Sequence, residues 1–319
     1  MLRAYLERMM RMTVLASGSK GNSMVVSSAR TRILVDAGMS CRELFKRMRA
    51  AEEDPATLDA ILITHEHQDH VQGLAVTARK LGVPVFFTEA THRAWTRWMM
   101  PQKRMTYADW LERRKQAAAT PAEPACADAE DEAAEELAPG ESLSHKSEAD
   151  PCRLPGVEYF QAGTAFCVGD IAVTPFTIPH DAADPVGFVF EADGVRVGLA
   201  TDLGYVPPNV QQQLRGCDVL MIESNHDLEM LRDGPYPWSV KQRVMSRVGH
   251  LSNEAAAGFL ERNYDGKATY VVLAHLSESN NLPELARVAA ERALQERMSL
   301  LANKLLLARQ HEPIASICL

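Results

Sequence analysis

Short apolar runs alternate with amphipathic stretches along most of the chain. Runs of continuous or period-2 apolar character are typical of strands, and one-sided apolar faces are typical of helices. Ser40 is a suitable N-cap for one such helix. The predicted strands lie near 12–17, 23–28, 31–36, 58–64, 171–177, 186–191, 195–200, 217–222 and 269–274. The predicted helices begin at Ser40 or span 70–81, 207–214, 238–247, 253–263 and 283–298. This order predicts an α/β protein in which each half carries a sheet followed by outer helices, as in a four-layer αββα sandwich.

A cluster of metal-binding side chains follows the apolar stretch 58–63. Residues 64–70 read Thr-His-Glu-His-Gln-Asp-His. Neutral imidazole is the commonest metal-binding side chain, and carboxylates add hard oxygen ligands. In an extended segment His65 and His67 point the same way, and Asp69 and His70 then turn toward a second position. The spacing predicts a site for two metal ions rather than a polar loop in which histidines cluster by chance.

Further polar blocks along the chain carry a family resemblance. The blocks are residues 15–23, 33–38, 178–188, 200–205, 223–227, 249–253 and 274–277. The 64–70 cluster resembles the signature of the metallo-β-lactamase fold superfamily. With the other blocks it resembles the WalJ/YycJ group, bacterial proteins of the phosphodiesterase branch that also holds ribonuclease Z and the phosphoribosyl cyclic phosphodiesterase. The resemblance covers about residues 12–108 and 155–310, and it implies a four-layer αββα metallo-β-lactamase sandwich.

Three more candidate ligands follow predicted strands. They are His180, Asp202 and His275. The resemblance implies two ligand groups that share one aspartate: His65, His67 and His180; Asp69, His70 and His275; with Asp202 between them. It also implies that Asp36 braces the metal loop by hydrogen bonds. In β-lactamases a cysteine commonly stands at the position of Asp202, and because none stands here, we set that activity aside.

The remaining site residues have expected roles in catalysis and substrate binding. Paired divalent ions activate a water molecule for in-line displacement, so the nucleophile is expected to be a metal-bridging hydroxide. His250 is the candidate donor of a proton to the leaving group, because it resembles a ribonuclease Z histidine near the scissile phosphate. Its alternative role is a local hydrogen bond at a helix N-terminus. Asp69 and His250 are the candidate catalytic residues, and Ser19, Asn22 and His226 are candidate substrate contacts, with support of the site as the alternative role of His226. Asp181 and Glu223 are expected to orient imidazoles.

The resemblance implies a dinuclear phosphodiesterase, specifically a 5′-to-3′ exonuclease that acts on DNA rather than RNA. The ligand types allow zinc or manganese. The alternatives are a cyclic phosphodiesterase, a thioester hydrolase of the glyoxalase II type, and a signalling accessory whose metal site is only structural. The sequence leaves the oligomeric state open.

Composition places few limits on the chain. Of its 319 residues 46% are hydrophobic, and no apolar run approaches the roughly 18 residues of a membrane span. Residues 1–11 lack the features of a signal peptide and are expected to be an N-terminal extension, although Met9, Met10 and Met12 allow a later start. The six cysteines are scattered without a Cys-x-x-Cys pair. We expect a cytoplasmic protein that does not bind membranes.

Charge is distributed unevenly along the chain. Residues 120–150 carry ten acidic side chains against Lys146, and this net charge of −9 within a whole-chain charge of −8 leaves the remainder near +1. The stretch is rich in alanine and poor in large apolar residues, so we expect an acidic disordered insertion over 116–154 that interrupts a catalytic domain spanning 12–319. The preceding segment 93–115 is basic and carries three tryptophans. Its two interpretations are a nucleic-acid contact with which the insertion competes, and an amphipathic helix whose tryptophans pack on the sheet.

Overall fold

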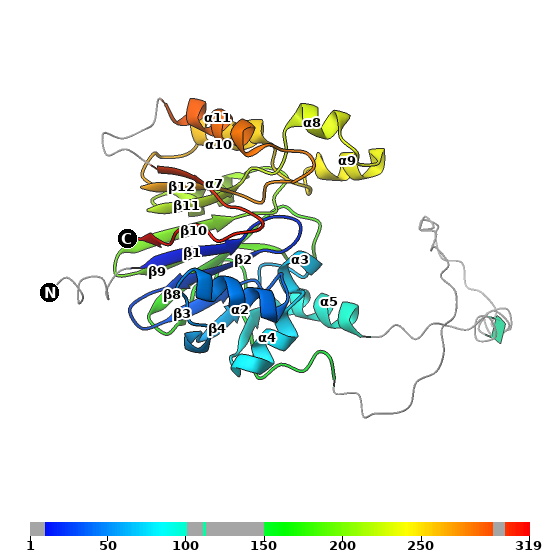
Figure 1. Cartoon of the computed structure of the whole chain (residues 1–319), viewed down its shortest axis with the longest axis vertical. Helices are drawn as coiled ribbons and strands as arrows, with labels where there is room; N and C mark the ends of the chain where they lie inside the picture. Colours follow the sequence, from blue (N-terminus) through cyan, green and yellow to red (C-terminus); the bar gives the residue numbers. More distant parts are fainter. Residues whose placement is uncertain (1–9, 101–110, 113–149, 296–303) are drawn as a thin grey trace.

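Two β-sheets stack face to face between outer layers of helices (Figure 1). The computed structural model describes residues 10–100, 111–112, 150–295 and 304–319, and in this part of the chain each sheet has seven strands. The first sheet has the order β14 (Ile317–Cys318), β1 (Arg11–Ala16), β2 (Ser23–Ser27), β3 (Arg32–Val35), β4 (Ala60–Leu62), β5 (Val85–Phe87) and β6 (Val157–Tyr159). The second has the order β13 (Lys304–Leu307), β12 (Tyr270–Ala274), β11 (Val219–Glu223), β10 (Val195–Ala200), β9 (Val186–Ala192), β8 (Ile171–Thr177) and β7 (Phe166–Val168).

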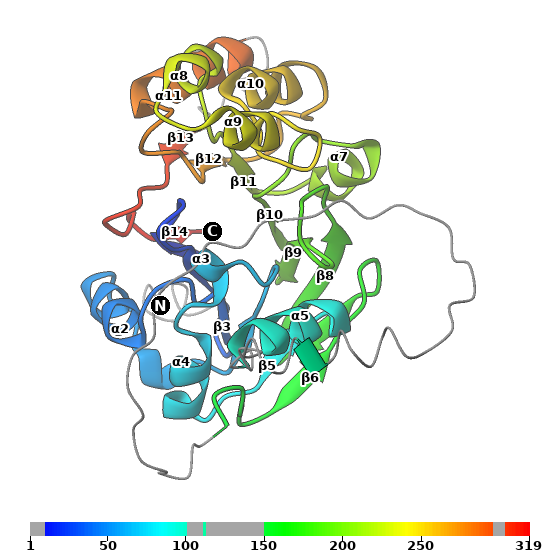
Figure 2. The same cartoon turned by 90° about the vertical axis from the view of Figure 1, so that its right-hand side faces the viewer.

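The helices cover the outer faces of the two sheets, as the 90° view in Figure 2 also shows. Beside the first sheet lie α2 (Cys41–Ala50), the short 3₁₀ turn η1 (Pro55–Thr57), α3 (Gln68–Val71), α4 (Leu74–Leu81) and α5 (Glu89–Met99). Beside the second lie α7 (Pro208–Leu214), α8 (Leu228–Asp233), α9 (Trp238–Val244), α10 (Asn253–Arg262) and α11 (Pro283–Leu294). The predicted αββα class is therefore confirmed.

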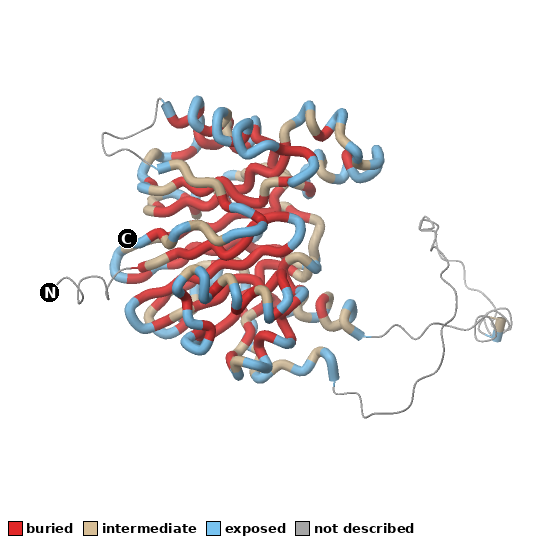
Figure 3. The backbone as a smooth tube through the Cα atoms, in the orientation of Figure 1, coloured by how far each residue is buried: buried red, intermediate tan, exposed pale blue. Residues whose placement is uncertain are grey.

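Alternation along the strands builds three separate cores. In β3, Ile33 and Val35 point into the core between the sheets, whereas Leu34 packs against the helices outside the first sheet. In β12, Val272 points into the core between the two sheets, whereas Val271 packs against α10 and α11. Figure 3 shows the result, with the central strands mostly buried and the helices buried mainly on one side. Full burial of each such side chain contributes about 1.5–3 kcal/mol, so the three cores fix the layer order.

The single helix predicted over 70–81 is wrong, because the structure breaks it into α3 and α4. Gly73 lies at the break, and a Cβ atom there would stand only 2.0 Å from the Met39 carbonyl oxygen. The Gly73 amide donates to the Ala37 carbonyl, which holds the two backbone segments together. Close approach of two backbone segments therefore interrupts a pattern that looked continuous in the sequence.

Several expectations fall on residues beyond those described. The predicted extension at 1–11 and the predicted insertion at 116–154 lie mostly outside the described residues, as does the second half of the basic segment 93–115. Within that segment, Trp95 of α5 is fully buried against the first sheet, whereas Trp98 is 54% exposed. In the described ranges there is no helix with the length and apolar character needed to cross a membrane.

Parallel strand pairing brings the functional loops to one edge of the sandwich. Strands β3 and β4 pair in parallel in the first sheet, as do β10, β11 and β12 in the second. The carboxyl ends of neighbouring parallel strands meet at the same edge of a sheet. Asp36 and the 64–70 loop follow strands of the first sheet, and Asp202 and His275 follow strands of the second. The topology thus gathers residues that are far apart in the sequence.

Candidate metal centre

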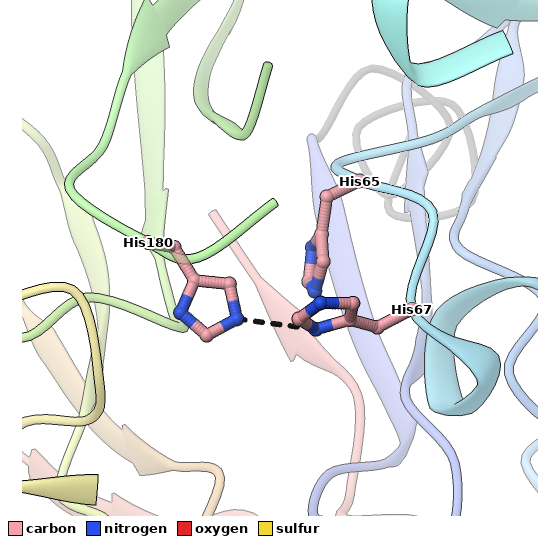
Figure 4. A group of neighbouring side chains, drawn as sticks. All are labelled: His65, His67 and His180. Carbon is pink, nitrogen blue, oxygen red and sulfur yellow. Dashed lines mark hydrogen bonds between the residues drawn. The ribbon is translucent and has the colours of Figure 1, made fainter. Parts of the chain in front are cut away.

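Three histidines face one another across the two halves of the sandwich. His65 and His67 come from the loop between β4 and α3, and His180 comes from the loop after β8 (Figure 4). His180 Nε2 lies 3.2 Å from His67 Nδ1, and one ligand atom from each ring lies within 4.8 Å of the others. We call these residues the all-histidine set.

Main-chain carbonyl groups orient two rings of the all-histidine set. His67 Nε2 donates to the Asp181 carbonyl at 3.2 Å, and His180 Nδ1 donates to the Val248 carbonyl at 3.1 Å. His65 Nδ1 donates to the Thr64 hydroxyl at 3.0 Å. Each ring therefore has one nitrogen held by the protein, and the other turned toward the centre. Metal-binding histidines are typically held in this way.

A second group combines a carboxylate with two more histidines. Asp69 Oδ2 lies 3.5 Å from His70 Nε2 and 3.6 Å from His275 Nε2. We call Asp69, His70 and His275 the carboxylate set. Asp202 Oδ2 lies 3.5 Å from His70 Nε2, and Asp202 also groups with His65, so its carboxylate stands between the two sets.

Acidic side chains orient the histidines of the carboxylate set. His70 Nδ1 donates to Asp36 Oδ2 at 2.8 Å, and His275 Nδ1 donates to Glu223 Oε1 at 2.9 Å. Asp36 also accepts hydrogen bonds from the amide and the hydroxyl of Thr64, both at 2.9 Å. Asp36 therefore fastens the start of the metal loop and one of its rings at the same time.

Three of these residues adopt left-handed backbone conformations. The φ angles are 58° at Asp36, 62° at Asp202 and 56° at His275. Aspartate and histidine tolerate this region better than most residues, but it still costs free energy. Asp36 and His275 stand directly after a strand, and Asp202 stands two residues after one. The turns aim Asp202 and His275 at the shared centre and Asp36 at His70. Strain at a strand end is typical of a functional site.

Buried polar atoms without partners show that the centre fits a cation. In the described part of the chain, His65 Nε2, His275 Nε2 and Asp202 Oδ2 are buried and lack hydrogen bonds. A buried polar atom without a partner costs about 1–3 kcal/mol. All three atoms point into the centre, where imidazole nitrogens and carboxylate oxygens are the ligands that divalent transition metals prefer. The residues therefore fit divalent metal binding, which the fold implies.

The two sets differ in protonation. Burial, together with the charge of neighbouring rings, holds the pKa of His65 well below its ordinary value, and burial also lowers the pKa of His180. Burial opposes protonation of His70 as well, but the negative charges of Asp69, Asp202 and Asp36 outweigh it and raise the pKa of His70 to about 9. The pKa of His275 is likewise raised because nearby carboxylates outweigh its burial.

His250 stands at the edge of the centre and is paired with Glu223. Its Nδ1 donates to Glu223 Oε1 at 2.8 Å, and its side chain is 21% exposed. Burial disfavours the charged ring, but the charge of Glu223 and the hydrogen bond to it raise the pKa of His250 above its ordinary value. Glu223 is fully buried and also accepts from the Leu203 amide at 2.8 Å, so one carboxylate positions both His250 and His275.

The candidate substrate contacts are placed differently from one another. Asn22 Nδ2 donates to Asp69 Oδ2 at 3.1 Å and lies 3.0 Å from His70 Nε2, so it touches the carboxylate set directly. Ser19 is exposed in the turn after β1, and among the described residues no hydrogen bond joins it to the site. His226 is buried outside both sets, and burial lowers its pKa to about 4.

Two residues of the site were not anticipated from the sequence. The Thr64 hydroxyl contacts His65, His70 and Asp36, and its position before the first histidine was the only signal available. Arg243 Nε donates to Asp181 Oδ2 beside His180. Arg243 lies in α9, and nothing in the sequence marked it.

Comparison with known proteins agrees with this geometry. A family model described as the beta-lactamase superfamily domain matches residues 31–276. The exodeoxyribonuclease YycJ of Bacillus anthracis is 34% identical over 285 residues, which is 89% of each chain. The exodeoxyribonuclease WalJ of Streptococcus pneumoniae is 33% identical over 276 residues, covering 86% of this chain and 85% of that one.

Among solved structures, the metallo-β-lactamase fold protein YhfI of Bacillus subtilis has a TM-score of 0.59 and 14% identity. The match covers 96% of this chain and 99% of YhfI, and at this identity it shows the fold alone. The family model spans most of this chain. The two exodeoxyribonucleases match this chain over 89% and 85% of their own lengths. This chain belongs to the beta-lactamase superfamily and, within its metallo-β-lactamase fold, to the group that contains YycJ and WalJ.

Proposed function

We propose that this protein is a metal-dependent exodeoxyribonuclease that hydrolyses phosphodiester bonds of DNA from the 5′ end. The observation that carries the proposal is the pair of facing ligand sets with His250 at their edge. The similarity to relatives named exodeoxyribonucleases supports DNA as the substrate. DNA as substrate also favours action in the cytoplasm.

The chain offers ligands for two divalent ions. The all-histidine set would hold one ion, the carboxylate set the other, and Asp202 would contact both. Nitrogen-rich ligands favour zinc, and the added carboxylates also suit manganese. When bound, such a pair of ions lowers the pKa of water and stabilises negative charge on a phosphoryl group.

His250 is placed to protonate the leaving group. Its Nδ1 is engaged by Glu223, so Nε2 is the atom that carries an available proton. Burial opposes the charged ring, but the charge of Glu223 and the hydrogen bond to it raise the pKa of His250 above its ordinary value, which favours the protonated form. In the hydrolysis, the water oxygen forms a bond to phosphorus and gives up a proton to the solvent, from which His250 is later reprotonated. The bond from phosphorus to the leaving oxygen breaks, and its electron pair stays on that oxygen. That oxygen takes the proton held at His250 Nε2, which yields an alcohol and a phosphate monoester.

The remaining residues of the centre position these groups. Asn22 contacts both Asp69 and His70 and would fix the carboxylate of Asp69. Asp36 holds His70, and Glu223 holds His275 and His250 in one orientation. His226 lies outside the ligand sets, so we assign it to support of the neighbouring loop rather than to substrate contact.

The direct test is digestion of end-labelled DNA by protein reconstituted with zinc or manganese. We expect mononucleotides to be released first from the 5′ end, and little release from matched RNA. Release from the 3′ end alone would overturn the polarity. Hydrolysis of lactoylglutathione, with no cleavage of any phosphodiester, would instead favour a thioester hydrolase, and a metal-loaded protein inert on both would favour an accessory role.

A leaving-group comparison tests His250 separately. p-Nitrophenolate is stable as an anion, whereas the alkoxide of a nucleotide needs a proton. We expect His250→Ala to lower the rate on DNA by about 10²-fold or more and to lower the rate on bis-p-nitrophenyl phosphate much less. Equal losses on both substrates would show that His250 does not act as the proton donor.

A further inference from the structure

The segment 234–250, which includes α9, forms one wall of the metal centre. The Val248 carbonyl accepts from His180 Nδ1 at 3.1 Å and from the Asp181 amide at 3.0 Å. The His250 amide donates back to the Val244 carbonyl at 2.9 Å. Figure 1 and Figure 2 place α9 on the same side of the molecule as α3, which follows the metal loop. A ligand that binds to α9 would therefore lie beside the metal centre.

This wall is positively charged in a chain of net charge −8. Residues 234–250 contain Lys241, Arg243 and Arg247 and no aspartate or glutamate. Lys241 is buried, and its Nζ donates to the Arg232 carbonyl at 2.7 Å, which ties α9 to α8. The two arginines are exposed. Of the three cations in this segment, only Arg243 and Arg247 are therefore available to an external anion.

The two arginines stand beside different loops of the centre. Arg243 bonds to Asp181, the residue after His180, yet 61% of its side chain is exposed. The Arg247 guanidinium lies 4.5 Å from the centre of the Tyr205 ring, and Tyr205 follows Asp202 by three residues. Phosphate groups that approach the metal centre from this wall would therefore meet a cation at either loop.

The same segment also carries exposed apolar side chains. Trp238 is 63% exposed, Met245 43% and Val248 44%. Several exposed apolar side chains on one segment, together with its link to the metal centre through Val248 and His250, indicate a contact surface. An indole face stacks on any unpaired base, and arginines supply the counter-charge for the adjoining phosphates. An exposed indole and exposed arginines on one segment are typical of a surface that binds a single nucleic-acid strand.

We propose that α9 and the following loop bind the unpaired DNA strand next to the scissile phosphodiester. Trp238 stacks on a base, and Arg243 and Arg247 pair with phosphates. The proposal rests on the proposed nuclease function and adds the surface that selects its substrate. Because a paired base hides its face inside the duplex, this surface favours single-stranded or frayed ends over intact duplex.

The test measures binding of the metal-loaded protein to a fluorescent single strand with phosphorothioate linkages, which resist hydrolysis, over a series of salt concentrations. We expect Trp238→Ala to weaken binding about 5- to 100-fold with no change in the salt dependence. We expect Arg247→Ala to lower the slope of log K against log salt by about 0.7. Trp238→Tyr should restore binding, and Arg247→Lys should restore the slope.

A matched control and a second substrate separate the two proposals. Arg287→Ala removes an exposed arginine from α11 and should change neither quantity. Arg287→Ala should hydrolyse bis-p-nitrophenyl phosphate at the wild-type rate, and Trp238→Ala and Arg247→Ala should lose more activity on DNA than on this small substrate. Wild-type affinity and salt dependence in both variants would overturn the role of α9. A wild-type protein that hydrolyses the small phosphodiester but never DNA would overturn the nuclease function instead.

Discussion

Both ligand sets of the metal centre contain histidines with shifted pKa values, but the shifts are in opposite directions in the two sets. In the all-histidine set, main-chain carbonyls hold His67 and His180, and burial keeps His65 and His180 neutral. In the carboxylate set, acidic side chains hold His70 and His275, and their charge favours protonated rings. The difference is one of partner, since a carbonyl orients a ring at little electrostatic cost, whereas a carboxylate also attracts a proton.

This contrast has a consequence for metal loading. A metal ion binds neutral imidazole, so a protonated ring must first release its proton. The all-histidine set is therefore prepared for an ion near neutral pH, whereas binding at the carboxylate set competes with protons. We expect the two sets to differ in affinity, in pH dependence and in their sensitivity to substitution.

The largest effect is expected where the two sets meet. Asp202→Asn retains a side chain that tolerates the left-handed backbone, but it removes the charge shared by both sets. We expect the rate on bis-p-nitrophenyl phosphate to fall by about 10³-fold or more, because both ions lose a ligand. Enzyme assay with measurement of bound metal checks this result. Asp233→Asn, an exposed control in α8, should leave both unchanged. Full activity in Asp202→Asn would show that the two sets work independently.

A smaller and selective effect is expected from the residue that orients one set alone. Asp36→Asn keeps the left-handed backbone but replaces the carboxylate that accepts from His70. We expect affinity for one of the two ions to fall about 10- to 100-fold, with the other ion unaffected. Metal titration by calorimetry resolves the two binding events. Equal weakening of both would mean that Asp36 acts on the whole loop through Thr64, and that the sets are not separable.

The sequence predicts the contents of the centre better than the way in which they are held. His65, His67, Asp69 and His70 are contiguous, so their spacing alone indicates metal ligands. The main-chain carbonyl of Val248, which orients His180, has no side-chain signature and depends on how α9 folds back over the β8 loop. The same limit applies to Arg243, which reaches Asp181 only through tertiary structure.

The fold shows a similar division. Strands such as β3 and β12 alternate between two cores, and their pattern predicts them. Strands β5 and β6 have three residues each, which is too short for a periodic pattern to identify. The break between α3 and α4 depends on contact of Gly73 with the Met39 carbonyl, a long-range approach that helical periodicity cannot show.

The most gradual effect is expected from pH, and it tests the contrast between the sets directly. Below a pKa of about 9, His70 carries a proton in the metal-free protein. One of the two ions should therefore bind at least about tenfold more tightly for each pH unit from 7 to 9, because its binding displaces protons from His70 and His275. The other ion should show little dependence, because His65 and His180 are already neutral. Calorimetry in buffers of different ionisation enthalpy counts the protons released by each ion.

The pH dependence of the stability of the metal-free protein provides an independent test of the protonation of His70. Because the folded state raises the pKa of His70 from 6.5 to about 9, its contribution is complete below pH 6.5 and is lost as pH rises through 9. The loss amounts to about 3 kcal/mol, so the Tm of the metal-free protein should fall over this range. His311→Gln, an exposed control, should not alter the fall, whereas Asp36→Asn should reduce it. A Tm that is flat from pH 6.5 to 9 would show that His70 is neutral and that the two sets do not differ in protonation.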